Sequence, residues 1–188
     1  MNTRRGFTIV ELLIVIVVIA ILAAITIVAY NGLQQRANTS AIIDGAVKSK
    51  RFIESYIVAN DQYPYTTDTA FVCITTDSTC RRNGGPGFAN ATFNTTLAAF
   101  GTPPKRVPLA SDIRGGITYQ YDPARIVDGA SRPAILSYYL PGVSADCGMS
   151  VLNGESQTLT TSTNRYTISN VGGTGVTQCV VSINGLSV

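Results

Sequence analysis

The chain has 188 residues, a length that suits one domain, and its formal net charge is only +3. A charge this small gives no bulk electrostatic reason to bind nucleic acid, so nucleic acid is not indicated as a partner beyond local patches. The sequence contains no histidine, which excludes Ser–His and Cys–His catalytic pairs, and its carboxylates are scattered. We therefore expect no enzyme, no cofactor and no metal, with a membrane-anchored exported enzyme as a minor alternative.

The first thirty residues combine a basic leader with an apolar run. Arg4 and Arg5 precede the run, and no polar side chain occurs from Leu12 to Ile25. After Thr26, apolar residues continue through Tyr30, and about 20 such residues are enough to cross a bilayer as a helix. Because positive charge lies ahead of the run, we expect the N-terminus to stay cytoplasmic and the remainder to be exported.

Three kinds of N-terminal segment match this run in part. A cleaved secretory signal peptide requires a small-residue site after the apolar core, and Ala23-Ala24 matches that requirement poorly. A twin-arginine export signal has the paired arginines but also lacks a cleavage site. A plain membrane anchor gives no reason for Glu11, which lies inside the apolar run.

Glu11 therefore discriminates between these interpretations. A carboxylate at the centre of a membrane helix costs on the order of 2–3 kcal/mol, so such a residue is functional by default, unless it snorkels to the interface. A free amine on Phe7 would lie four residues earlier, on the same helix face. That amine exists only if the chain is cut between Gly6 and Phe7.

The segment Arg5–Leu13 (R-G-F-T-I-V-E-L-L) resembles the class III signal sequence of type IV prepilins and pseudopilins. The resemblance implies that a membrane aspartyl peptidase cuts after Gly6 and N-methylates Phe7. It also implies that Glu11 pairs with the N-terminal amine of a neighbouring subunit and thereby sets the assembly register. The resemblance is strong over residues 5 to about 38; beyond them it concerns architecture alone.

After the apolar run, the hydrophobic pattern becomes one-sided. Apolar residues at helical spacing predict an amphipathic helix that packs on a soluble domain: Ile42, Ala46, Ile53 and Ile57. Pro64 limits this helix, which we expect to end between Val58 and Gln62. The apolar first part of such a helix must lie in a bilayer or pack against other copies, because it cannot remain in water.

The remaining sequence predicts short, turn-linked strands. Residues 61–116 look irregular, with a glycine-rich turn at Asn83–Gly87 and a short helix from Ala91 to Phe100. Four later segments have strand patterns: Ile117–Tyr121, Ala134–Leu140, Arg165–Ser169 and Gln178–Ile183. We expect an α+β fold with a long, protruding N-terminal α-helix packed by its C-terminal half on an antiparallel β-sheet. The resemblance implies the same pilin-like arrangement.

The four cysteines favour two disulfides in an exported protein, because their number is even. Of the three possible pairings, we favour Cys73 with Cys80, which are close in sequence, and Cys147 with Cys179, which would staple the C-terminal part of the sheet. The second pair also matches, by position, the C-terminal disulfide loop of many pilins. A zinc site competes with this interpretation, although no C-x-x-C pair or histidine supports it.

These segments suggest an order of domains along the chain. We expect a leader at residues 1–6, a transmembrane or filament-core helix segment at 7–30 and a globular domain at 31–188. The globular domain would comprise an amphipathic helix (31–60), an αβ-loop region (61–116) and an antiparallel sheet with a C-terminal loop (117–188). Loss of the two arginines in the leader would lower the net charge to +1.

The resemblance implies a structural subunit of a type IV pilus, a surface filament used in adhesion, twitching motility or DNA uptake. Its expected partners are further copies in a helical filament, a prepilin peptidase, an assembly platform and an ATPase. The chain would be a single-pass membrane protein before assembly and part of an extracellular pilus afterwards. Two alternatives stay open: a pseudopilin or minor pilin of a type II secretion or competence machine, and a membrane-anchored binding module that never polymerises.

Overall fold

The computed structural model describes residues 7–66, 71–75, 80–82, 85–86, 88–127, 130–149, 167–168, 171–183 and 185. The chain divides into two compact units, Met1–Ala37 and Asn38–Val188, and the long helix α1 (Ile9–Asn60) contributes to both. The other elements follow in chain order: β1 (Val72–Cys73), β2 (Arg81–Arg82), β3 (Gly85–Pro86), β4 (Phe88–Ala89), α2 (Ala91–Ala98), β5 (Leu109–Ser111), β6 (Arg114–Gly115), β7 (Ile117–Tyr121), β8 (Ile126–Val127), β9 (Ala130–Ser131), β10 (Ala134–Pro141), β11 (Thr167–Ile168), the 3₁₀ turn η1 (Val171–Gly173) and β12 (Val176–Ser182).

Helix α1 ends where the sequence predicts. Its last residue is Asn60, inside the expected interval, and Asp61 follows in the left-handed region with a φ of 52°. The Asp61 N–H donates to the carbonyl oxygen of Ile57 at 2.9 Å, so the final turn keeps a backbone partner. The helix thus ends before Pro64, whose ring disfavours helical backbone in the residue before it.

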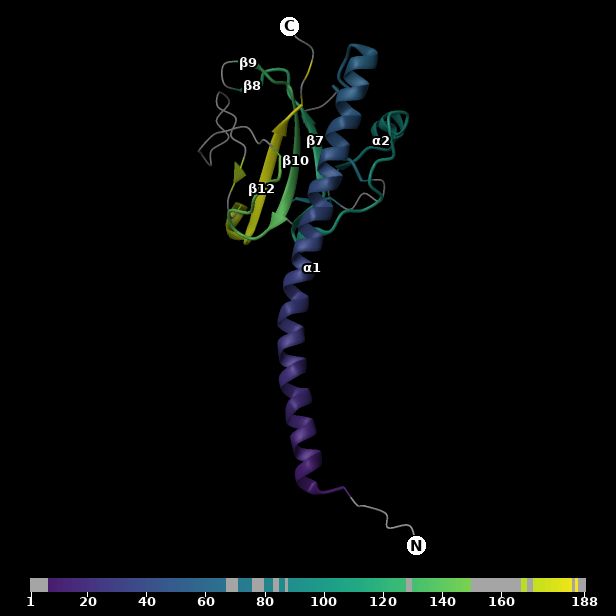
Figure 1. Ribbon diagram of the computed structural model, residues 1–188. Coiled ribbons are helices and arrows are strands. Elements are labelled where there is room, and N and C mark those ends of the chain that lie inside the picture. The colour runs from purple at the N-terminus through teal and green to yellow at the C-terminus, as the bar shows by residue number, and fades with distance from the viewer. Residues whose placement is uncertain are drawn as a thin grey trace. The chain divides into compact units, whose positions relative to one another are not determined.

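The part of α1 in the second unit buries the apolar stripe predicted from the sequence. Ile42, Ala46 and Ile53 have no exposed surface, and Ile57 retains only 2%. These side chains join a core that includes residues from β7, β10 and β12, and Figure 1 shows this part of α1 beside those strands. Gly45 permits close contact, since a Cβ there would lie 3.0 Å from the Ile117 side chain. The expected helix-on-sheet packing is therefore confirmed.

The main sheet contains six strands in the order β11-β12-β10-β7-β1-β4. Its neighbours pair antiparallel within the described residues, apart from the parallel pair of β1 and β4. Alternation along β10 gives the sheet two different faces. Leu136, Tyr138 and Leu140 join the core against α1, whereas Ser137 and Tyr139 lie on the other face and are also buried. The fold is thus α+β and pilin-like, as expected.

Strand prediction succeeded where the pattern was long enough. β7 covers the predicted residues, β10 extends one residue further than predicted, and β12 begins two residues earlier. Of the third candidate segment, Arg165–Ser169, Thr167 and Ile168 form β11, and the rest lies outside the described residues. Helix α2 ends at Ala98, two residues before the predicted end.

The expectation for residues 61–116 needs a correction. This region, expected to be irregular apart from one helix, also contains the short strands β1 to β6. Gly85 and Pro86, assigned to a turn from the sequence, pair antiparallel with Arg82 and Arg81. Asn83, Gly84 and Gly87 lie outside the described residues. Strands of two or three residues are too short to show a periodic pattern, which is why the sequence did not reveal them.

Two disulfides join the cysteines in the pairs favoured from the sequence. Cys73 in β1 is bonded to Cys80, and Cys147 is bonded to Cys179 in β12. The Cα atoms are 5.7 Å and 5.8 Å apart, within the normal range for a disulfide. All four residues are buried, so both bonds belong to the core of the second unit.

Candidate assembly site on the N-terminal helix

Helix α1 begins with a reciprocal pair of side-chain caps. Thr8 precedes the first helical residue, and its hydroxyl oxygen accepts a hydrogen bond from the Glu11 N–H at 3.2 Å. In return, the Glu11 carboxylate oxygen Oε2 accepts from the Thr8 N–H at 2.8 Å and from the Thr8 hydroxyl at 2.7 Å. This arrangement is a capping box, which satisfies two of the N–H groups that a helix start leaves without backbone partners.

The capping box uses one of the two carboxylate oxygens of Glu11. Within the described part of the chain, Oε1 makes no hydrogen bond or ion pair. Glu11 is exposed, and it is the only charged residue between positions 7 and 35 of the sequence. An ionised carboxylate can accept about four hydrogen bonds. Glu11 can therefore cap its own helix and still accept a bond from a cation outside the chain.

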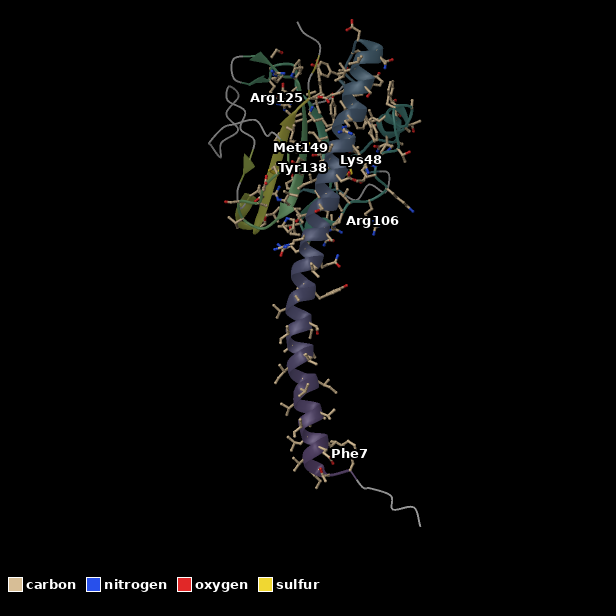
Figure 2. All side chains as sticks on the ribbon, viewed as in Figure 1. Phe7, Lys48, Arg106, Arg125, Tyr138 and Met149 are labelled. Atoms are coloured by element: carbon tan, nitrogen blue, oxygen red, sulfur yellow. A yellow bond between two sulfur atoms is a disulfide. The ribbon has the colours of Figure 1, made fainter. Side chains whose placement is uncertain are left out.

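A continuous apolar surface surrounds this carboxylate. All residues from 7 to 37 are exposed, and side chains project on all sides of the N-terminal part of α1 in Figure 2. Even Val17, the least exposed large apolar residue between positions 7 and 37, retains 47% of its surface. Monomeric soluble proteins rarely expose apolar patches of more than a few hundred Å². Among the described residues, α1 is the helix that is long and apolar enough to cross a membrane.

Of the other predicted site residues, only Phe7 is described at the helix start. Phe7 directly precedes the Thr8 cap and is 76% exposed. Figure 2 labels it at the N-terminal end of α1. Gly6, the predicted cleavage residue, lies outside the described residues. The predicted cysteines form disulfides in the second unit and contribute nothing to this site.

Thr8 is the residue that the sequence analysis missed. The pattern Thr8-Ile9-Val10-Glu11 directly before a long apolar run is a capping-box signature, which needs a threonine followed three residues later by a glutamate. The interpretation of Glu11 in the sequence analysis names a partner outside the helix and leaves out this local partner. The structure shows that a local partner exists and that it leaves one oxygen available.

Among the described residues, Tyr119 and Tyr138 have the largest pKa shifts, and both belong to the core of the second unit. Burial raises the pKa of Tyr119 and Tyr138 above the ordinary value for tyrosine. The Tyr119 ring stacks on Phe93 with centroids 5.1 Å apart, and the Tyr138 hydroxyl donates to the Cys147 carbonyl oxygen at 2.5 Å. Neither tyrosine faces a group of metal-ligating side chains, since the described residues contain no such group.

Comparisons with known proteins point to the same N-terminal segment. Residues 1–27 match the family model described as the prokaryotic N-terminal methylation motif. The chain is 37% identical over 78 residues to a fimbrial protein of Neisseria meningitidis, covering 41% of this chain and 46% of that protein. It is 28% identical over 163 residues to fimbrial protein Q of Moraxella bovis, covering 75% of this chain and 97% of that protein.

A third relative belongs to a different machine. The chain is 29% identical over 66 residues to the type II secretion system core protein G of Klebsiella pneumoniae, covering 35% of this chain and 47% of that protein. The matches to the Neisseria and Klebsiella proteins thus span about half the length of those proteins. No solved structure matches the chain.

Proposed function

We propose that this chain, a protein of the type IV pilin family, is a structural subunit of a type IV pilus that assembles through helix α1. The exposed apolar surface of residues 7–30, interrupted by the lone carboxylate of Glu11, carries the proposal. Such a surface must be covered by lipid or by other protein chains. Lipid would cover it before assembly, and the helices of neighbouring subunits would cover it within the filament.

The expected processing follows from the N-terminal motif. A prepilin peptidase would cut between Gly6 and Phe7 and methylate the new amine of Phe7. The leader that carries Arg4 and Arg5 would remain on the cytoplasmic side, because positive charge retains its end of a membrane helix there. An assembly platform and an ATPase would then move the subunit out of the membrane into the growing filament. The protein itself would have a structural role, without catalytic activity.

Glu11 would act as the residue that sets the register between subunits. A buried carboxylate is costly unless it is paired, so an apolar helix bundle that contains Glu11 is favoured when a cation lies opposite it. The N-terminal amine of a neighbouring subunit would supply that cation to Oε1. Thr8 would be a positioning residue, since its N–H and hydroxyl hold Oε2 at 2.8 Å and 2.7 Å.

Substitution of Glu11 tests the assembly role directly. In cells that produce Glu11→Ala, we expect export and processing to continue while sheared filaments fall about tenfold or more, because the loss of a charge-assisted pair costs about 1.5–3 kcal/mol. Glu54→Ala is the matched control, because Glu54 lies in the same helix but pairs with Lys50 in the second unit. Normal filament yield from Glu11→Ala would contradict the register role.

Two further variants separate the capping role of Glu11 from its pairing role. Thr8→Val removes the side-chain cap while Glu11 keeps its charge, so assembly should decline less than in Glu11→Ala. Glu11→Gln can still accept a hydrogen bond from Thr8 but carries no charge. We expect Glu11→Gln to resemble Glu11→Ala in filament yield. If Glu11→Gln assembled normally while Thr8→Val did not, capping rather than charge pairing would explain the residue.

The mass of the exported protein tests the processing step. We expect protein sheared from cells to begin at N-methylated Phe7 and to be about four hydrogens lighter than the reduced chain, because two disulfides have formed. A chain that begins at Met1, or one cut after the apolar run, would contradict the filament proposal.

A pseudopilin is the second candidate, favoured by the similarity to the type II secretion core protein G. Both candidates use the same N-terminal motif, so abundance distinguishes them. A pilus subunit should dominate the sheared surface material, whereas a pseudopilin should be rare there and its deletion should block protein secretion. A membrane-anchored module that never polymerises would show no change in its assembly state on Glu11→Ala.

A further inference from the structure

Arg114, in the second unit, is a buried cation that forms no ion pair with the described residues. It lies in β6 and is only 8% exposed, with its guanidinium carbon 5.8 Å from the centre of the Tyr139 ring. Its buried Nε has no hydrogen-bond partner, and no acidic side chain in the described part of the chain forms an ion pair with it. A buried charge is costly unless it is paired, so this environment lacks a group of opposite charge.

Two hydroxyl groups near Arg114 also have no hydrogen-bond partner in the part of the chain that the structure describes. Ser111 in β5 is the cross-strand partner of Arg114, and its hydroxyl oxygen is buried without a hydrogen bond. The Tyr139 hydroxyl is buried without one as well. Gly172 in η1 lies close by, since a Cβ there would be 3.3 Å from Arg114 Nη2. Arg114 thus lies over Tyr139 on the face of β10 that points away from the α1 core, and Ser111 is its neighbour across the strand pair.

A second buried arginine, Arg125, shows by comparison which interactions Arg114 lacks among the described residues. Arg125 is 6% exposed, and its guanidinium donates to the Pro133 carbonyl oxygen at 3.0 Å and to Gln120 Oε1 at 2.6 Å. Asp122 lies 3.8 Å from its Nη2 and balances the charge. Arg125 thus has acceptors and an anion, whereas Arg114 has the face of the Tyr139 ring and no anion among the described residues. The partner that Arg114 lacks among the described residues is therefore an anion that accepts hydrogen bonds.

We propose that Arg114, Ser111 and Tyr139 form a binding site for a carboxylate group. A carboxylate is planar and matches the donor fork of a guanidinium, and both hydroxyls can donate to its oxygens. The Tyr139 ring holds the guanidinium by a cation–π contact, and apolar Val171 and Val176 pack against that ring. The group is supplied by a free carboxylic acid or by an acidic side chain of a second copy. The site lies outside the N-terminal segment and does not depend on filament assembly.

Acetate is the probe for the site. The full chain in detergent micelles is titrated with sodium acetate, with sodium chloride at equal ionic strength as the reference, and both the thermal midpoint and the line width of labelled acetate are recorded. We expect the thermal midpoint of the wild type to rise saturably with acetate. In Arg114→Gln we expect the affinity for acetate to fall about tenfold or more, so that this rise is lost, since hydrogen bonds to charged groups are strong. Arg51→Gln, at an exposed position of α1, is the matched control.

The titration also identifies the source of the carboxylate. A midpoint that rises with protein concentration in the absence of acetate, in the wild type but not in Arg114→Gln, assigns the carboxylate to a second copy and supports the same site. If Arg114→Gln does not fold, Tyr139→Phe and Ser111→Ala replace it, and each should weaken acetate binding. Equal responses of wild type and variants to acetate and to protein concentration would overturn the proposal.

Discussion

The two disulfides should differ in their contribution to stability, and their loop lengths fix the order. Cys147 and Cys179 are 32 positions apart, whereas Cys73 and Cys80 are 7 positions apart. By the chain-entropy relation, closing the longer loop stabilises the fold by about 3.7 kcal/mol at 25 °C and closing the shorter one by about 2.4 kcal/mol. The longer loop restricts more of the unfolded chain, so its removal should cost more.

Paired alanine variants measure this difference. The double variant that removes Cys147 and Cys179 should lower the thermal midpoint by about 7–15 °C, since a unit of this size loses about 2–4 °C per kcal/mol. The variant that removes Cys73 and Cys80 serves as the matched comparison and should lose about 5–10 °C on the same scale. Urea unfolding followed by the near-ultraviolet circular dichroism of the tyrosines gives the free energies. Equal losses, or a larger loss for the short loop, would refute the loop-entropy reasoning.

Two further predictions concern the core of the second unit. Ile53→Ala should destabilise it by about 2–5 kcal/mol, because Ile53 is fully buried between α1 and the sheet. Val58→Ala, at a position that is 86% exposed, should change stability by less than about 0.5 kcal/mol, and equal effects in urea unfolding would contradict the packing described. Burial raises the pKa of Tyr119 and Tyr138 above 10.0, so the folded state keeps protons that the unfolded state releases. Their contribution is complete below about pH 10 and is lost as the pH rises further, and absorbance at 295 nm should show both ionising only on unfolding. Ionisation near pH 10 with native circular dichroism would contradict their burial.

The features that the sequence predicted well are those with a long repeating pattern. The apolar run and the one-sided stripe from Ile42 to Ile57 predicted the existence and packing face of α1, and Pro64 predicted where it ends. The alternation in Ile117–Tyr121 and the β-rich segment Ala134–Leu140 located the central strands of the sheet. Strands such as β1 and β2 contain two residues each, and long-range pairing decides their conformation. No local pattern of two residues carries that information.

The site shows the same division between local and distant information. The motif around Glu11 is local, because all of its members lie within the segment Arg5–Leu13, so the sequence was enough to single it out. The environment of Arg114 depends on Tyr139 and Gly172, which reach it only through the fold, and no local pattern distinguishes Arg114 in the sequence. The two carboxylate oxygens of Glu11 are an intermediate case. The sequence contains the signature for the Thr8 cap, but only the geometry shows that the cap occupies Oε2 alone. Because Oε1 has no partner in the described chain, capping and pairing with a second subunit are compatible, and a single glutamate can fulfil both roles.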